Sequence, residues 1–318
     1  MNIKRIVCIA LAAFLPAGGA AVCQSFNQSV ELVDIPLLYE TDGHPDHGFF
    51  SEIHSISMDE KKRVLYVLHD TPAILSSFNG EDGLPLDKRD FAARVEPPAR
   101  AEACAGKIWI IVNRRLMLLG DDNSLVPPAP GGAELPAADF AECSPTGELL
   151  AVDAKKKELF TIPKDGAPRQ IDASALDPKK HPSPKKLFAS ITGVAFGPLN
   201  RLYVLDRDGG VIRSIDYAGR LLSSILLASP SGAHVPWKVS SIAADSADRI
   251  WAVNTTENSL DVYDSFGALI YRVRDMPADG GGFRFTRPAE ILIDNDGRLF
   301  LSDTGSAKIA VFDISRLP

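Results

Sequence analysis

The sequence predicts an all-β six-bladed propeller with four-stranded blades, the last of which is closed by the N-terminal strand. Three observations lead to this fold class. Short apolar strands that end in Asp or Asn recur along the chain, and each lies between two other strands that are set off by tight turns. The chain also stops after only three strands of its final unit.

The polar residues at the ends of the second strands give the number of blades. They are Asp70, Asn113, Asp153, Asp206, Asn254 and Asp303, with spacings of 43, 40, 53, 48 and 49 residues. A four-stranded blade occupies about 40–50 residues, so six marks predict six blades. Because the acidic residue recurs in most blades, we interpret it as a structural acceptor for turn amides and not as a catalytic carboxylate.

Alternation of apolar and polar residues, bounded by turn residues, places the strands of each blade in order. Blade one is predicted at 53–58, 63–68, 73–78 and 90–95, blade two at 100–104, 107–112 and 115–119, and blade three at 139–143, 148–152, 157–162 and 168–172. Blade four is predicted at 191–196, 201–205, 210–216 and 220–227, blade five at 239–244, 249–253, 259–263 and 269–273, and blade six at 289–293, 298–302 and 307–312. A fourth strand of blade two is not clear before the Pro-rich stretch 126–130.

The final blade lacks an outer strand, and the strand-like segment Val30–Leu38 has no other place in the repeat. We expect this segment to complete the blade and close the ring, because an open ring would leave unpaired backbone groups at a sheet edge. A frayed N-terminal arm is the alternative, and Pro36 fits an edge strand in either case.

The string that begins at Pro288 resembles an NHL repeat. It reads Pro-Ala-Glu-Ile-Leu-Ile-Asp-Asn-Asp-Gly-Arg-Leu-Phe-Leu-Ser-Asp-Thr-Gly and continues to Ile309, Val311 and Phe312-Asp313. The array from residue 30 to 318 is similar to six-bladed NHL-type propellers, an architecture shared with gluconolactonase-like proteins. The resemblance implies the fold, whereas function depends on the site that a particular chain carries.

Residues 1–23 are predicted to be a secretory signal peptide, and residues 24–318 a single propeller domain. Lys4 and Arg5 precede the apolar run 6–15, which is too short to span a membrane, and small residues follow it. The bulky Val22 disfavours a lipid anchor on Cys23. We therefore expect a secreted or periplasmic monomer, and the net charge of −7 argues against a nucleic-acid partner.

Two cysteines occupy nearly the same position in neighbouring blades. Cys104 and Cys143 both lie on inner strands, and an exported protein favours a disulfide between them. Inner strands can also be too far apart for a disulfide, so two buried thiols fit the sequence as well.

The predicted ligand surface is the face that carries the loops before the inner strands and after the second strands. Because these strands are antiparallel neighbours, both sets of loops lie on one face. All six histidines fall in these loops or at the strand ends that adjoin them: His44, His47, His54, His69, His181 and His234. The predicted ligand-binding residues around the channel mouth are His54, Arg100, Asp139, Thr192, Trp237, Ser241 and Glu290.

A metal site is the alternative use of the same face. Two imidazoles and a carboxylate suit zinc, and calcium is a further option; the candidate ligands are His54, His69, Glu52 and Asp70, with His44, Asp46 and His47 nearby. In gluconolactonase-like propellers a glutamate, an asparagine and an aspartate at the starts of inner strands hold a divalent cation. The matching positions here are His54, Thr192 and Ser240, which reproduce none of these ligands. We therefore expect no cofactor, and divalent metal is the alternative.

The sequence thus favours an exported binding or interaction module. Its ligand is a protein, a peptide, a saccharide or a small molecule, and the sequence does not rank these classes. The alternative is a metal-dependent hydrolase or lyase of the six-bladed propeller superfamily, and a third possibility is a structural role in a cell-envelope assembly.

Overall fold

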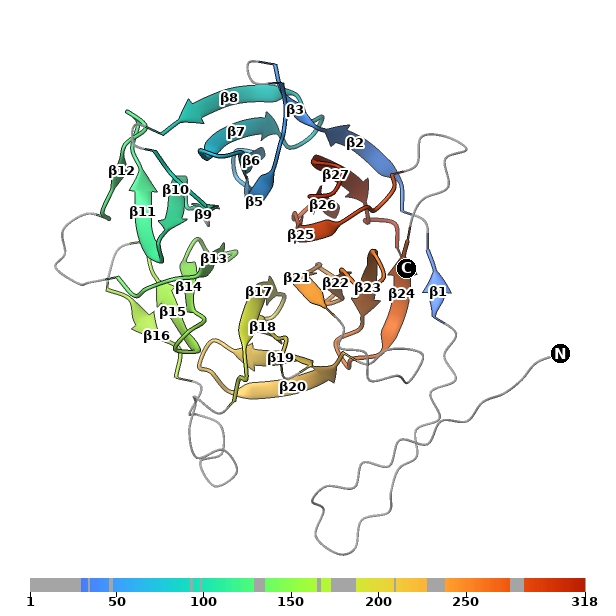
Figure 1. The fold of residues 1–318 in the computed structure, drawn as a ribbon. Helices are drawn as coiled ribbons and strands as arrows, with labels where there is room; N and C mark the ends of the chain where they lie inside the picture. The colour runs from blue at the N-terminus through green and yellow to red at the C-terminus, as the bar shows by residue number, and fades with distance from the viewer. Residues whose placement is uncertain are drawn as a thin grey trace, which may run out of the picture.

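The chain forms a ring of six four-stranded antiparallel sheets around a central axis, which confirms the predicted fold class (Figure 1). The computed structural model describes residues 30–33, 35–45, 48–91, 94–97, 99–128, 135–164, 167–172, 187–208, 210–227, 238–274 and 283–317; the side chains of Leu32 and His44 are not described. Within these ranges every regular element is a strand, and no helix is long and apolar enough to cross a membrane.

The first three blades follow one another along the chain, each with its strands in sequence order from the channel outward. Blade one contains β5 (Ile53–Asp59), β6 (Val64–His69), β7 (Ile74–Asn79) and β8 (Pro85–Asp90); blade two contains β9 (Ala99–Cys104), β10 (Lys107–Val112), β11 (Arg115–Leu119) and β12 (Leu125–Val126). Blade three contains β13 (Phe140–Cys143), β14 (Leu149–Asp153), β15 (Glu158–Ile162) and β16 (Arg169–Gln170).

The last three blades repeat this order, and the N-terminal segment supplies the remaining strands. Blade four contains β17 (Ile191–Gly197), β18 (Arg201–Asp206), β19 (Val211–Asp216) and β20 (Leu221–Leu226); blade five contains β21 (Val239–Ala244), β22 (Ile250–Asn254), β23 (Ser259–Tyr263) and β24 (Leu269–Val273). Blade six contains β25 (Pro288–Ile293), β26 (Arg298–Asp303), β27 (Lys308–Asp313) and β2 (Leu37–Thr41). The short strands β1 (Glu31–Leu32), β3 (Gly43–His44) and β4 (Gly48–Phe49) complete the described set.

The N-terminal strand closes the ring, but not with the predicted residues. β2 pairs antiparallel with β27, with Leu37 opposite Phe312 and Tyr39 opposite Val311. The expectation that Val30–Leu38 forms this strand was wrong by several residues: Glu31 and Leu32 pair in parallel with β24 of blade five instead. The reason is Ile35, which lies between β1 and β2 in the sequence. Its side chain is buried in the core shared by blades five and six, so the chain passes from blade five to blade six at this residue.

The outer strand of blade one also differs from the prediction. The sequence places it at 90–95, whereas β8 occupies Pro85–Asp90. Asn79 and Gly83 form a tight turn, closed by hydrogen bonds of 2.9 Å and 2.8 Å, that starts the strand early. Because β8 is exposed on both faces and rich in charge, it lacks the alternation by which strands are recognised.

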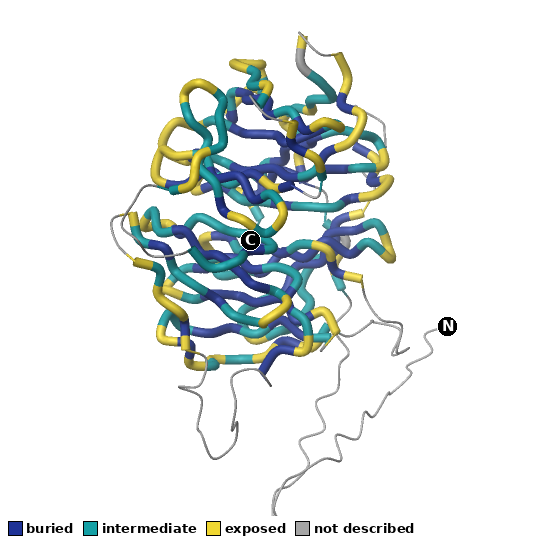
Figure 2. The backbone as a smooth tube through the Cα atoms, turned by 60° about the vertical axis from the view of Figure 1, so that its left-hand side comes forward, coloured by how far each residue is buried: buried dark blue, intermediate teal, exposed yellow. Residues whose placement is uncertain are grey.

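The core consists of one apolar cluster at each of the six junctions between neighbouring blades. Figure 2 shows the buried segments running through the body of the ring, with exposed segments mainly at the turns. The largest cluster joins blades five and six and includes Trp251, Leu301 and Phe312, all fully buried. Each sheet is therefore covered on both faces, which makes the ring a rigid support for its channel.

Asp153 and Asp303 accept backbone amides of the turn that follows them, as predicted. Asp206 and Asp303 also bind amides of the loops before their inner strands and so fix these loops. Asp303 accepts from Thr286, Arg287, Gly305 and Ser306, and Asp206 accepts from Ala189 and Ser190. Blade one departs from this pattern. The strand position that matches Asp303 is His69, and the following residue, Asp70, supplies the carboxylate.

Candidate functional site: the central channel

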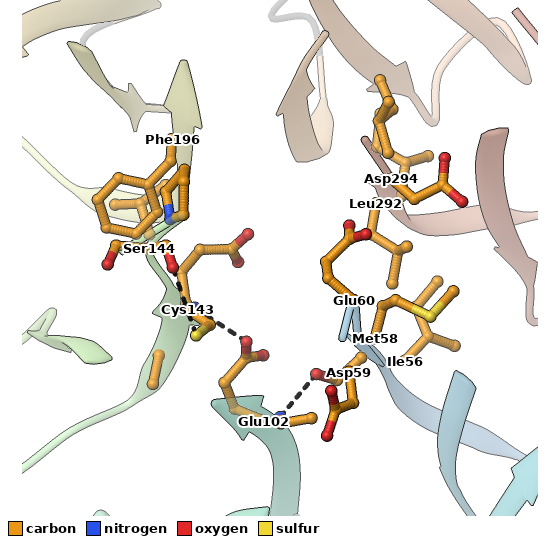
Figure 3. A pocket seen from close by; sticks show the side chains of 18 of the residues that line it. Ile56, Met58, Asp59, Glu60, Glu102, Cys143, Ser144, Phe196, Leu292 and Asp294 are labelled. Carbon is orange, nitrogen blue, oxygen red and sulfur yellow. Dashed lines mark hydrogen bonds between the residues drawn. The ribbon is translucent and has the colours of Figure 1, made fainter. Parts of the chain in front are cut away.

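The six inner strands surround a channel with a volume of about 870 Å³. Its lining combines small and hydroxylated residues with charged residues of both signs, and it runs from the starts of the inner strands to the turns at their other ends. Figure 3 shows Phe196 on one side of this space, opposite Met58 and Glu60. The channel is large enough to hold a small organic ligand.

Three glutamates from different blades line the channel: Glu102, Glu142 and Glu290. Glu102 crosses from β9 to accept the backbone N–H of Cys143 at 2.9 Å (Figure 3). Glu290 accepts the N–H of Ile56 at 2.9 Å, and its other oxygen accepts from Arg100 at 2.7 Å. Two of these carboxylates therefore connect one inner strand to the next, and Arg100 supplies a cation that pairs with Glu290.

The environment of the cluster favours its protonated forms. Burial, followed by the charge of Glu290, raises the pKa of Glu142 to about 8, although Arg100 acts in the opposite direction. Burial is also the largest cause that raises the pKa of Glu102 well above its ordinary value, and the charge of Glu142 adds to it. Carboxyl groups that share a narrow site cannot all ionise at low cost. At neutral pH the cluster therefore retains at least one proton.

Hydroxyl groups make similar connections elsewhere around the ring. Ser55 and Ser57 accept the N–H groups of Ala101 and Ala103 at 2.9 Å and 2.8 Å, and Ser241 accepts the N–H of Ile291 at 3.3 Å. Thr192 differs, because its buried Oγ1 has no hydrogen-bond partner among the described residues. A buried hydroxyl without a partner is costly, and in a channel lining it is available to a ligand.

The opposite end of the channel carries charges of both signs, because Lys61, Lys62 and Lys164 line the channel together with the acidic residues there. Asp59, Glu60 and Asp294 lie at the turns that follow β5 and β25, and all three line the channel (Figure 3). Burial is the main cause that raises the pKa of Glu60, and Asp294 adds to it; burial likewise raises the pKa of Asp294. Carboxyl groups therefore extend along the length of the channel.

The structure brings four of the predicted ligand-binding residues into the channel lining: Arg100, Thr192, Ser241 and Glu290. His54 lies outside the lining, and its Nε2 is 2.6 Å from the backbone oxygen of Asp70. Asp139 pairs with Arg114 and accepts the N–H of Ala154. Trp237 lies outside the described residues.

The proposed metal ligands lie near one another, but His54, His69 and Asp70 are hydrogen-bonded to each other and to Ser51 and Ser76. His69 is 1 % exposed; its Nδ1 is 3.0 Å from Asp70 Oδ2, and its Nε2 is 2.8 Å from Ser76 Oγ. Burial opposes ionisation of Asp70, but hydrogen bonds from Ser51 and the adjacent His69 leave its pKa lowered. In the parts of the chain described, no group of three His, Cys, Asp or Glu side chains is arranged to hold a metal ion. Glu52 is exposed, and Asp46, His47, His181 and His234 lie outside the described ranges.

The sequence analysis missed Glu102 and Glu142. The signal for both is a glutamate between small residues within an inner strand, in Ala101-Glu102-Ala103 and in Ala141-Glu142-Cys143. Charged residues are rarely enclosed in this way without a function or a partner.

A disulfide joins the two inner strands that carry these glutamates. Cys104 and Cys143 are bonded, with their Cα atoms 5.2 Å apart. The bond lies beside the hydrogen bond from Cys143 to Glu102, so both tie β9 to β13. The inner strands are thus close enough at this point for the cross-link that the sequence left open.

Comparison with known proteins supports the fold but does not establish the function, which must be inferred from the residues of the site. No protein-family model and no curated protein matches the sequence. Among solved structures, a gluconolactonase from Xanthomonas campestris is similar at a TM-score of 0.57 and 16 % identity, over 87 % of this chain and 88 % of that one. A streptogramin B lyase gives 0.56 at 13 % identity, covering 86 % and 97 %. The calcium-binding protein regucalcin from Agrobacterium tumefaciens gives 0.59 at 13 %, covering 90 % and 95 %. The chain therefore shares the six-bladed propeller architecture of these proteins.

Proposed function

We propose that the protein is an exported NHL-type propeller that binds a small ligand with a cationic group in its central channel. The observation that carries this proposal is the set of three glutamates, Glu102, Glu142 and Glu290, facing a channel of about 870 Å³. The predicted signal peptide and the Cys104–Cys143 disulfide support export. The channel replaces the histidine-rich loops as the proposed ligand site.

A cationic group is the chemistry that such a cluster recognises best. A ligand cation near Glu142 stabilises its ionised form, so binding lowers the pKa of this group and releases a proton. The released proton makes the affinity depend on pH: below the pKa of about 8, binding must first deprotonate the site. Thr192 supplies a hydroxyl that has no other described partner. The rigid ring holds these groups in place before the ligand arrives.

The second candidate is a hydrolase or lyase, in line with the enzymes among the similar structures. Glu142 is the residue that favours it, because a carboxyl group with a pKa of about 8 is protonated at neutral pH and can donate a proton. A metal ion does not fit the described residues as they are placed, since no three potential ligands converge. We therefore assign no step to a metal.

Calorimetric titration with putrescine, a small diamine, and separately with calcium tests the proposal. Putrescine is expected to bind at pH 8.5 and to bind roughly 10- to 100-fold more weakly at pH 6, because a proton must then leave Glu142. Binding is expected to be lost in the double variant Glu102→Gln/Glu142→Gln.

The matched control is Glu96→Gln, which removes an exposed carboxylate outside the channel and is expected to bind as the wild type does. Absence of putrescine binding, or equal binding by the double variant, would contradict the cation-binding function. Binding of calcium with loss in the same double variant, and none of putrescine, would favour the metal-dependent alternative.

A further inference from the structure

Two phenylalanines line the channel at the junction of blades three and four, where Glu142 also lies. Phe140 comes two residues before Glu142 on β13, and the ladder to β14 is regular over both residues, so their side chains are on the same face of the strand. The other phenylalanine is Phe196, the residue before last of the neighbouring inner strand β17. Glu142 therefore lies on an aromatic part of the channel lining.

Both phenylalanine rings are anchored in the core and leave part of their surface in the channel. Phe140 and Phe196 are partly buried and pack against the apolar cluster shared by blades three and four, which includes Leu150 and Leu202. The ring of Phe196 also meets the ring of Tyr217 edge to face, with the centroids 5.8 Å apart. The rings are thus held in place before a ligand arrives, which lowers the entropy cost of binding an apolar group against them.

A second apolar wall lies across the channel, at the junction of blades six and one. Leu292 of β25 and Met58 of β5 line the channel and are partly buried against the apolar cluster of that junction. In a ring of six blades this junction is opposite the one between blades three and four (Figure 1), and Figure 3 shows Leu292 and Met58 across the space from Phe196. The carboxyl groups of the channel are therefore accompanied by apolar surface on two sides.

The volume of the channel also points to a ligand larger than a simple diamine. A volume of about 870 Å³ is in the range of pockets that enclose drug-sized molecules. A four-carbon diamine fills only a small part of it and leaves the channel surface of Phe140 and Phe196 in contact with water. An apolar group on the ligand removes that surface from water, which raises the affinity about fourfold for each methylene that is fully buried.

We propose that the channel binds an amine that carries an apolar body, with its ammonium group at Glu142 and the body between Phe196 and Leu292. This inference rests on the cation-binding function proposed above and narrows the ligand class from any small cation to an amphiphilic one. The aromatic lining suits both parts of such a ligand, because a ring face attracts a cation and also covers apolar surface. The glutamates then select the charge, and Phe196 and Leu292 select the body.

Calorimetric titration at pH 8.5 with butylamine, hexylamine and octylamine tests the proposal, because these amines carry the same charge and differ only in apolar length. The affinity is expected to rise about two- to fourfold with each added methylene, so that octylamine binds at least about tenfold more tightly than butylamine. The uncharged control is 1-octanol, which has the same chain without the ammonium group. It is expected to bind at least about tenfold more weakly than octylamine.

Phe196→Ala is expected to weaken octylamine binding about tenfold and butylamine binding less than about threefold, because the longer chain covers more of the ring. Since Phe196 also packs against the core, thermal unfolding is measured first, and Leu292→Asn makes the same test from the opposite wall. The matched control is Phe266→Ala, which removes a phenylalanine that is 93 % exposed in the turn after β23. This control is expected to bind every amine as the wild type does.

The outcomes separate this inference from the function on which it rests. Equal affinity for butylamine and octylamine, with binding still lost in Glu102→Gln/Glu142→Gln, would overturn the amphiphilic ligand and leave the cation-binding function in place. A dependence on chain length that persists in both Phe196→Ala and Leu292→Asn, or 1-octanol that binds as tightly as octylamine, would also overturn the inference. A protein that binds none of the amines would contradict the cation-binding function itself.

Discussion

Replacement of Glu142 by glutamine is expected to raise the free energy of unfolding by about 2–4 kcal/mol near pH 8.5 and to leave it almost unchanged near pH 4.5. The pKa of Glu142 is raised to about 8 in the folded chain, so the folded state binds its proton more tightly than the unfolded state does. The resulting stability is fully present below the unfolded pKa and is lost as the pH rises through 8. Glutamine carries no charge and avoids that loss. Urea denaturation at several pH values measures the effect.

Glu96→Gln is the control for this experiment, since Glu96 is an exposed glutamate paired with the exposed Arg94. Its substitution is expected to change stability by less than about 1 kcal/mol at both pH values. If Glu142→Gln and the wild type keep the same difference in stability at both pH values, Glu142 does not hold a proton in the folded channel.

Removal of residues 30–41 is expected to destabilise the protein by about 5 kcal/mol or more, through lost backbone hydrogen bonds and lost apolar burial. The truncation removes β2, the buried Ile35 and the hydrogen bond from Tyr39 to Gly80, and it leaves β27 as an open edge. The truncated chain is also expected to aggregate, because Ile309 and Val311 lie on the exposed edge strand. Thermal unfolding and light scattering report both effects.

Removal of residues 30–33 alone is the matched control, because it deletes β1 and keeps β2. This shorter truncation is expected to cost only about 1 kcal/mol, since β1 contributes a two-residue pairing. A synthetic peptide covering residues 35–41 is expected to restore part of the stability of the longer truncation. Equal stability of the two truncations would mean that β2 does not close the ring.

The ring can be predicted from the sequence because each repeat is marked by local features, namely turn residues and the alternation of apolar and polar residues. Turn residues and alternation identify the strands of blades four to six, and the repeated residues Asp153 and Asp303 bind turn amides as expected. The position of the closing strand is harder to predict from the sequence, since it depends on the packing of Ile35 in the core between blades five and six. Tertiary packing determines which residues form the closing strand, and no local sequence pattern predicts them.

The site was only partly accessible from the sequence. Arg100, Thr192, Ser241 and Glu290 follow from their places near the starts of inner strands. Glu102 and Glu142 were missed because their importance arises from proximity across blades, which changes pKa values and is absent from either segment alone. The histidines were overvalued for the converse reason: His69 has the chemistry of a ligand but is buried against Phe50 and Ser76.

The central claim is that the channel contains a carboxyl group that stays protonated at neutral pH. Carbon-13 NMR of protein labelled at the glutamate side-chain carboxyl carbons follows each group as the pH is raised from 4 to 10. We predict one resonance that titrates near pH 8 and disappears in Glu142→Gln. If every glutamate resonance of the wild type titrates below about pH 6, as unperturbed carboxyl groups do, the account of the channel is contradicted.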